Sequence, residues 1–254
     1  MKSENSESAQ EGQSRCCRST ALRCALQEAL RKSANPEKAP GMQAYMKSEM
    51  PYLGVQTPAL KAICRKVFTA HPLEAQKCWL DAIFTIWRNA DYREERYAAI
   101  KLAEHRAYRG FQTLDALPCY EEMITDGAWW DYVDAIASRL VGNLLKQYPE
   151  KMKTRMLEWA HSADIWKRRA SIICQLRFKE ATDFELLRAC IAPSIERREF
   201  FLRKATGWAL REYAKTNPDE VVAYIMDNAH RLSTLSKREA LRILLKTGDI
   251  AAVP

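Results

Sequence analysis

Residues 165–179 read IWKRRASIICQLRFK, and the dipeptide Arg169-Ala170 within them belongs to a repeat that runs through the chain. The same kind of dipeptide recurs at steps of 36, 37, 35, 35 and 35 residues, in Lys61-Ala62, Tyr97-Ala98, Asp134-Ala135, Arg169-Ala170, Lys204-Ala205 and Glu239-Ala240. A period near 35 residues is typical of an α-solenoid of HEAT or armadillo type. Because alanine permits close helix packing, the residue before each alanine is expected to point the same way in every repeat.

Nearly every segment has the hydrophobic period of a helix, and no convincing run of strands is found. Helices are predicted over residues 15–33, 37–50, 57–70, 73–88, 92–106, 112–124, 129–147, 149–160, 164–177, 183–191, 196–215, 218–229 and 236–246. Expected N-terminal signals are Thr57-Pro58, Asp164 and Ser236 as caps, with Pro149 and Pro218 in first turns. The sequence therefore predicts an all-α fold, a curved solenoid with a basic concave groove.

The chain has 254 residues, 47% of them hydrophobic, which is enough for a large core. We expect a disordered polar tail over residues 1–14 and a single solenoid domain over residues 15–254. The amino terminus lacks the apolar segment of a signal peptide, and the longest apolar runs are too short to cross a membrane. Eight cysteines form no CxxC motif and no zinc-ligand spacing, so we expect reduced thiols, a cytoplasmic (bacterial) location and no metal.

The net charge of +8 and the pI of about 9.1 favour an anionic partner. Residues 151–179 carry eight Lys or Arg against two acidic residues, which could be no more than a solvated face. Aromatic residues share helix faces with cations, however. Trp166 lies three residues before Arg169, and Lys204 and Arg211 flank Trp208. Cations for phosphates and flat rings for sugars and bases are the features of a nucleic-acid surface.

A carboxylate in such a surface needs its own explanation. Asp134 follows Trp130 by four residues, which places both on one helix face. Two interpretations remain open. Asp134 could pair with Arg169, one repeat further along the row. Alternatively, it could face the positive charge that develops on deoxyribose when a base is cleaved, as carboxylates do in glycosidases, with Trp130 offering a second electron-rich group. The neighbouring Trp129 is expected to pack in the core.

The chain resembles the AlkD-type DNA alkylation repair family, HEAT-like-repeat glycosylases that remove alkylated purines from DNA. The resemblance covers residues 35–246 and depends on the motifs YMKSEMPYLGVQTP, WWDYVD, IWKRRASIICQLRFK and FFLRKATGWALREYAKTNPD. It implies that Asp134 is the catalytic carboxylate and that Arg169 holds a phosphate beside it. It also implies that Trp130 and Trp208 pack on the sugar and backbone around the lesion.

Further DNA contacts are implied for Tyr45, Gln56, Arg177 and Arg211, with Arg177 standing where lysine is expected. Lys204 from the row and Arg168 from the basic segment complete the predicted contacts. The resemblance implies no cofactor, no metal, no flipped base and no Schiff-base lysine. A cationic N3- or N7-alkylpurine is already a good leaving group, so no strong general acid is expected.

Three functions therefore compete: an alkylpurine DNA glycosylase, a catalytically silent DNA or RNA binder on the same scaffold, and a protein-interaction solenoid. Periodicity alone favours the third. The cationic row, Asp134 and the resemblance favour the first, with double-stranded DNA containing alkylated purines as the partner and a monomer as the expected state.

Overall fold

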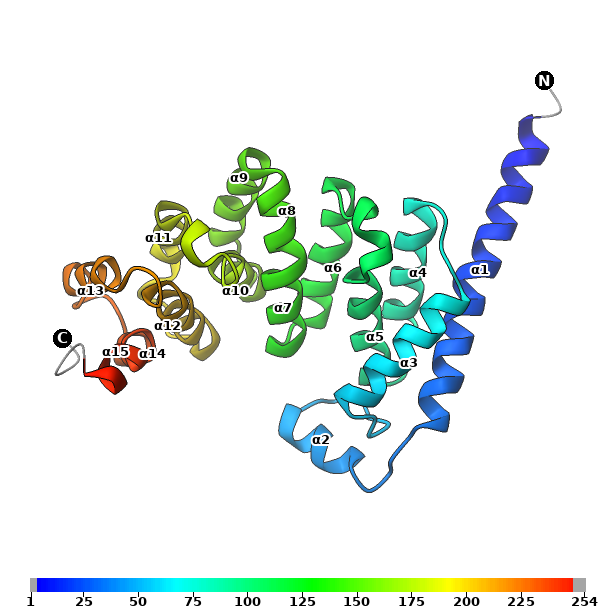
Figure 1. Ribbon diagram of the computed structural model, residues 1–254, viewed down its shortest axis with the longest axis horizontal. Helices are drawn as coiled ribbons and strands as arrows, with labels where there is room; N and C mark the ends of the chain where they lie inside the picture. Colours follow the sequence, from blue (N-terminus) through cyan, green and yellow to red (C-terminus); the bar gives the residue numbers. More distant parts are fainter. Residues whose placement is uncertain (1–3, 249–254) are drawn as a thin grey trace. The chain divides into compact units, whose positions relative to one another are not determined.

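The computed structural model describes the backbone of residues 4–248 and the side chains of residues 18–248. Its regular elements are helices, and no β-strand occurs between residues 4 and 248 (Figure 1). The all-α helical-repeat fold predicted from the sequence is confirmed. The curvature of the solenoid and its basic concave groove stay predictions.

The chain divides into two compact units, residues 1–119 and 120–254, where the sequence predicts one domain. The amino-terminal unit contains α1 (Glu4–Lys32), α2 (Ala39–Met46), α3 (Thr57–Ala70), α4 (Gln76–Arg88), α5 (Arg93–Ala103), η1 (Arg106–Phe111) and η2 (Leu114–Ala116). The boundary falls in the first turn of α6 (Leu117–Gly127). The carboxy-terminal unit continues with α7 (Trp130–Ala135), η3 (Ile136–Val141), α8 (Gly142–Gln147), α9 (Pro149–Ala160), α10 (Ile165–Ile173), η4 (Lys179–Ala181), α11 (Phe184–Ile191), η5 (Ala192–Ser194), α12 (Phe200–Ala214), α13 (Pro218–Asp227), α14 (Thr234–Ala240) and α15 (Arg242–Thr247).

The first helix begins earlier than the sequence predicts. α1 starts at Glu4 rather than near residue 15, so the structure has helix over residues 4–14, where a disordered tail is expected. Residues 1–3 of that tail lie outside the described residues. The segment from Glu4 to Lys32 contains no proline and only one glycine, so no residue in it blocks helical hydrogen bonding.

The helix starts follow local sequence signals, with two corrections. Thr57 is the first residue of α3 and not its cap, because Gln56 occupies the N-cap position. The carboxylate of Asp164 accepts hydrogen bonds from the backbone N–H groups of Trp166 and Lys167 at 2.7 and 2.9 Å, so the predicted cap is confirmed. Ser236 is not a cap. Ser233 is the N-cap of α14 and accepts from the N–H of Ser236, whose own side chain is buried between helices. Prolines occupy the first turns of α3, α9 and α13, as predicted.

The amino-terminal unit is built around α1, which packs against α3 and α4. Leu22, Leu26 and Leu30 recur every four residues along one face of α1 and are fully buried. Trp79 and Trp87 of α4 are also fully buried, which gives this unit a large apolar core.

A buried carboxylate fixes the segment between α2 and α3. Glu94 of α5 accepts hydrogen bonds from the backbone N–H groups of Leu53, Gly54 and Val55 at 2.9–3.0 Å. These three bonds compensate for the burial of the charge. Glu94 therefore has a structural role, which makes it a useful reference for other buried acids.

The 35-residue repeat is visible as contacts between successive repeats within each unit. Side-chain hydrogen bonds join residues 35 positions apart in Leu73–Tyr108, Gln76–Phe111, Asp134–Arg169, Glu196–Arg231 and Lys204–Glu239. The alanines of the repeat are fully buried at Ala98, Ala170, Ala205 and Ala240. The first step is an exception: Ala62 is exposed, because α3 buries Leu60, Cys64, Val67 and Phe68 instead. The expected equivalence of side-chain directions therefore fails at Lys61-Ala62.

Close helix packing in the carboxy-terminal unit depends on a glycine. A Cβ atom at Gly207 of α12 would lie 2.6 Å from Cβ of Glu239 and 2.7 Å from the carbonyl oxygen of Ser236, both on α14. Gly207 therefore allows α12 and α14 to approach more closely than any side chain would permit.

Gly207→Ala should lower the free energy of unfolding by about 1–3 kcal/mol, because the methyl group forces α12 and α14 apart. Gly41→Ala is the matched control, since a Cβ atom at Gly41 in α2 meets no atom within 4 Å. It should leave stability unchanged or raise it by up to about 1 kcal/mol through helix propensity. Urea denaturation followed by circular dichroism measures both, and a Gly207→Ala protein as stable as the parent would contradict the packing argument.

Candidate functional site

The WWDYVD segment lies at an irregular helix start. Ala128, just before it, has φ of 40°, and Trp129 is the extended N-cap of α7. α7 runs without a break into the π-helical turn η3 and then into α8. Asp134 stands two residues before η3, and the hydroxyl of Ser138 donates to its backbone carbonyl at 2.6 Å. Strained residues and π-helical turns are both frequent at functional sites.

Asp134 forms a two-point ion pair with Arg169 of α10. Nε of Arg169 donates to Oδ1 of Asp134 at 2.7 Å, and Nη2 donates to Oδ2 at 2.8 Å. Nη1 donates to the backbone carbonyl of Phe201 at 2.6 Å. The Arg169 side chain is 4% exposed and that of Asp134 is 15% exposed. The pair therefore joins α7, α10 and the start of α12, and the acid is its more accessible member.

The ionisation of Asp134 is set by opposing effects. Burial raises the pKa of Asp134 above its ordinary value, while the hydrogen bonds and positive charge of Arg169 act to lower it, and the nearby Asp131 adds to the rise. Each carboxylate oxygen accepts one bond from Arg169 and retains acceptor capacity. The carboxylate can therefore face a developing positive charge while Arg169 holds it in place.

The geometry gives Arg169 the role of fixing Asp134. Three of its nitrogens already donate within the protein, and the side chain is buried. The ion pair that the sequence left as one of two interpretations is thus present. The phosphate contact that the resemblance implies for Arg169 stays a prediction.

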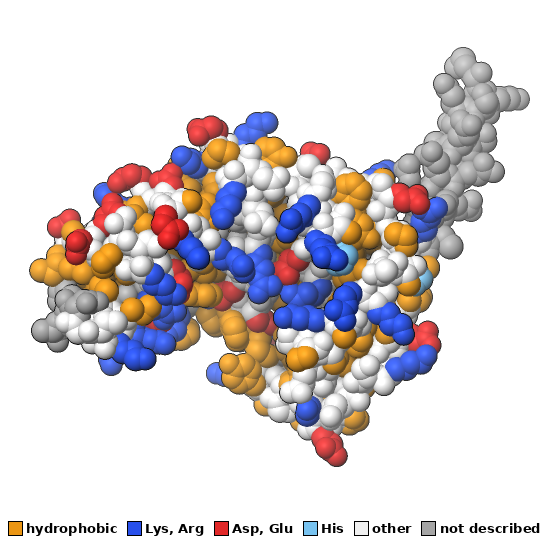
Figure 2. All heavy atoms as spheres, in the orientation of Figure 1, with side chains coloured by type: hydrophobic (Ala, Val, Ile, Leu, Met, Phe, Trp, Pro, Cys, Tyr) orange, Lys and Arg blue, Asp and Glu red, His pale blue; other side chains and the backbone are white. Residues whose placement is uncertain are grey.

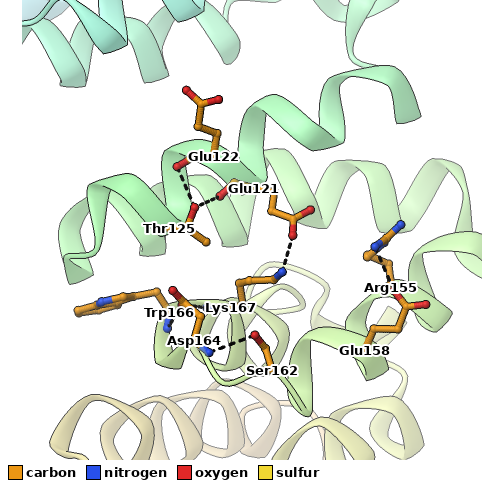
Figure 3. Close-up of polar contacts among 9 residues, drawn as sticks. All are labelled: Glu121, Glu122, Thr125, Arg155, Glu158, Ser162, Asp164, Trp166 and Lys167. Atoms are coloured by element: carbon orange, nitrogen blue, oxygen red, sulfur yellow. Dashed lines mark hydrogen bonds and ion pairs between the residues drawn. The ribbon is translucent and has the colours of Figure 1, made fainter.

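The amino-terminal end of α10 is held independently of this pair. The backbone N–H of Asp164 donates to the hydroxyl of Ser162 at 3.1 Å, and Asp164 in turn caps the helix. Lys167 points toward α6, where its ammonium group forms an ion pair with Glu121 (Figure 3). These contacts fix the start of α10, one turn before Arg169.

The aromatic residues divide into a packed cluster and a more accessible pair. Trp129, Trp166 and Phe201 form the cluster, with ring centroids 5.0–6.1 Å apart. Trp129 packs as predicted, but Trp166 is buried, so it does not form a nucleic-acid surface with Arg169. Trp130, at the first position of α7, and Trp208 of α12 are half-buried. Trp129 is half-buried as well, so Trp166 is the one buried tryptophan among these four.

A second ionic cluster surrounds Glu239 of α14. Its carboxylate accepts from the ammonium group of Lys204 and forms an ion pair with the guanidinium of Arg211, both on α12. Nη1 of Arg242 lies 3.8 Å from Oε1 of Glu239. Side-chain exposure is 39% for Lys204, 15% for Arg211 and 8% for Glu239. Figure 2 shows Lys and Arg side chains gathered over this part of the chain.

The remaining predicted contacts are dispersed. Arg168 donates to the carbonyls of Pro193 and Ser162 and to the hydroxyl of Ser194, so its guanidinium ties α10 to η5 and has a structural role, unlike the predicted DNA contact. Arg177 is exposed. Tyr45 (77% exposed) and the exposed Gln56 belong to the amino-terminal unit. Lys38 donates to the amide oxygen of Gln56 at 2.7 Å.

Two parts of the site were not predicted from the sequence, and only one of them left a signal there. The Phe201 carbonyl is a backbone group and leaves no side-chain signal. Glu239 was recognised as the last member of the row, and its spacing of 35 residues from Lys204 is the signal that could have predicted the pair.

No helix of the described part of the chain is long and apolar enough to cross a membrane. Among residues whose side chains are described, no group of three or more His, Cys, Asp or Glu side chains is arranged to hold a metal ion.

Known proteins resemble this chain in both sequence and structure. The model of a family described as DNA alkylation repair enzyme matches residues 26–244. A solved structure described as a predicted DNA alkylation repair enzyme from Enterococcus faecalis superimposes with a TM-score of 0.76 and 30% sequence identity. The match covers 84% of this chain and 98% of that one. No functionally curated protein matches the sequence.

Replacing Arg169 by methionine should lower the free energy of unfolding by about 3–5 kcal/mol, because the buried carboxyl of Asp134 loses its partner. The loss should be smaller at about pH 5 than at about pH 8. The variant lacks both influences that lower the pKa of Asp134, so its carboxyl takes up a proton at higher pH and is then buried as a neutral group.

Urea titrations at the two pH values measure this difference. Arg177→Met is the control, because an exposed arginine should contribute less than about 0.5 kcal/mol at either pH. An equal loss for Arg169→Met at both pH values would show that Asp134 does not depend on Arg169 for its charge.

Proposed function

Because this chain belongs to the DNA alkylation repair enzyme family, we propose that it is a DNA glycosylase that excises cationic N3- and N7-alkylpurines from duplex DNA. The reaction is hydrolysis of the N-glycosidic bond. The bond breaks with its electron pair on the purine, which leaves as a neutral base. The deoxyribose takes on oxocarbenium character, and water adds at C1′ with loss of a proton. No cofactor takes part in these steps.

One observation carries the proposal: Asp134 is a carboxylate fixed at two points, and it is more exposed than its partner. In a surface that binds phosphates, a negative charge weakens binding, so binding alone gives no reason for it. A fixed carboxylate stabilises a positive charge that develops in the transition state, and it needs no reorganisation as the bond breaks. The same oxygens can accept a hydrogen bond from the attacking water.

The two half-buried tryptophans complete the proposed site. Trp130 lies one helical turn before Asp134, so the two residues share one face of α7. Trp208 stands between two cations on α12. We assign both rings to packing on the sugar and backbone around the lesion, where an electron-rich face also favours the oxocarbenium.

We assign contacts with DNA phosphates to Lys204, Arg211 and Arg177 in the carboxy-terminal unit, and further DNA contacts to Tyr45 and Gln56 in the other. Each has a side chain that is at least partly exposed. Arg168 is left out because four of the five N–H donors of its guanidinium bond within the protein. The monomeric state and the cytoplasmic location stay predictions.

Asp134→Asn should slow release of N7-methylguanine from duplex DNA by about 10²–10³-fold, the effect of losing one preorganised electrostatic contact. Asparagine keeps the shape but removes the charge. It also turns one acceptor of Arg169 into a donor, so the variant should be less stable than the parent. The rate is therefore measured in single turnovers at saturating enzyme, and is divided by the folded fraction from circular dichroism at the same temperature.

Glu94→Gln is the control for lost stability, because Glu94 is a fully buried carboxylate with a structural role. Its rate per folded molecule should equal that of the parent. A folded Asp134→Asn protein that releases base at the parent rate would refute the catalytic role. A parent protein that binds DNA and releases no alkylated base would favour the silent DNA binder.

Duplex binding should depend steeply on salt and weakly on sequence. If about six phosphates are contacted, log K should fall against log salt concentration with a slope of roughly −5. Fluorescence anisotropy with labelled undamaged duplex measures the slope. Affinity that is unchanged between low and high salt would favour a protein partner.

A further inference from the structure

Two of the ion pairs with 35-residue spacing in the carboxy-terminal unit each have one buried member, and they have opposite polarity. In the first, the acid Asp134 precedes the base Arg169; in the second, the base Lys204 precedes the acid Glu239. Burial follows the polarity. Arg169 is 4% exposed against 15% for Asp134, and Glu239 is 8% exposed against 39% for Lys204. Each pair thus buries one charge and presents the opposite one.

We propose that Glu239 is a positioning residue that holds Lys204 and Arg211 as a two-cation clamp for a DNA phosphate beside Trp208. The inference rests on the proposed DNA binding, but it does not depend on base excision. In this arrangement Glu239 serves the two cations as Arg169 serves Asp134.

The spacing on α12 places the clamp around the tryptophan. Lys204, Trp208 and Arg211 are four and three residues apart, so they lie along one face of the helix. Glu239 spans both cations with its two oxygens: Oε2 accepts from Lys204, and Oε1 meets Nη1 of Arg211. One carboxylate from α14 therefore sets the distance between two cations on α12.

The approach of α14 to this face is made possible by Gly207, next to Trp208. Any Cβ atom there would collide with Cβ of Glu239. The close contact at Gly207 and the ion pairs of Glu239 thus join α12 and α14 in the same region. Because the hydroxyl of Ser236 also donates to the carbonyl of Arg203 at 3.0 Å, α14 is fastened to α12 on both sides of Lys204.

The charges of the cluster leave room for an anion. Lys204, Arg211 and Arg242 share the buried carboxylate of Glu239, and Glu212 lies 3.8 Å from Nε of Arg211, so three cations face two carboxylates. An ammonium group has three donors and a guanidinium has five, and Glu239 occupies only a part of them. The free donors of a fixed pair of cations suit the oxygens of a phosphate, because little side-chain entropy remains to be lost on binding.

The clamp predicts that removing the charge of Glu239 weakens DNA binding, whereas a simple count of charges predicts stronger binding. A negative charge near a phosphate weakens binding, so its removal should strengthen binding by electrostatics alone. Glu196 provides the comparison, because it also pairs with a base 35 residues later, Arg231, but in an exposed ion pair. Glu239→Gln and Glu196→Gln change the net charge equally, and only the first disturbs the clamp.

The test measures affinity for undamaged duplex by fluorescence anisotropy, between about 50 and 200 mM salt. Glu239→Gln should weaken binding by about fivefold, a typical coupling between directly interacting groups, while Glu196→Gln should leave it unchanged or strengthen it. In the background of Lys204→Met with Arg211→Met, Glu239→Gln should have no further effect, because the groups through which it acts are gone. Melting temperatures confirm that each protein is folded.

Three results would overturn the proposal: tighter binding by Glu239→Gln, equal effects of the two glutamine variants, or a loss that persists without the two cations. The last would mean that Glu239 acts only on folding.

If Glu239→Gln does not fold, Lys204→Met and Arg211→Met replace it. If one carboxylate holds both cations, the double variant should bind DNA more weakly than either single variant. Its loss of binding free energy should be smaller than the sum of the two single losses. Strict additivity would then refute the clamp. The test measures binding to undamaged DNA and requires no base excision. Failure of the clamp proposal therefore leaves the glycosylase proposal intact, and failure of the glycosylase proposal leaves the clamp proposal intact.

Discussion

The ion pair between Asp134 and Arg169 connects the parts of the carboxy-terminal unit on which the proposed chemistry depends. Burying two charges costs more than their attraction returns unless the geometry is good and the remaining donors are satisfied. Here both carboxylate oxygens are engaged, and the third guanidinium nitrogen reaches the carbonyl of Phe201. α7, α10 and α12 must therefore stay in fixed positions for the pair to persist, and the rest of the unit serves to keep them there.

Several features of the fold provide this constraint. The cap formed by Asp164 fixes the start of α10, and the cluster of Trp129, Trp166 and Phe201 fills the space between the helices that carry the pair. The π-helical turn η3 begins two residues after Asp134 and connects α7 to α8. One repeat further, Gly207 allows α14 to bring its own buried charge to α12. The same 35-residue step thus supports a partly accessible acid, Asp134, at one place and a more exposed base, Lys204, at the next.

The opposite burial of acid and base in the two ion pairs suits the two tasks of the proposed function, phosphate binding and stabilisation of a cationic sugar. Phosphate binding needs cations that stay charged and fixed, and a sugar that becomes cationic needs a carboxylate. If both charges were simply exposed on one flat face, they would pair with each other. Each is instead held by a buried partner of its own, so Asp134 and Lys204 can face different parts of one substrate. Membership of the DNA alkylation repair enzyme family implies DNA as the substrate.

The sequence by itself determined the helices, most of their boundaries and the 35-residue step, because hydrophobic period, proline and caps act over a few residues. It also predicted that Asp134, Arg169 and Lys204 form one row, and the structure shows the contact between the first two. Only the tertiary structure decided which member of each pair is buried, that Arg168 binds carbonyls, and that the repeat fails at Ala62. These outcomes depend on which helix packs over which side chain, and a one-dimensional pattern places residues on a helix face without specifying what covers that face.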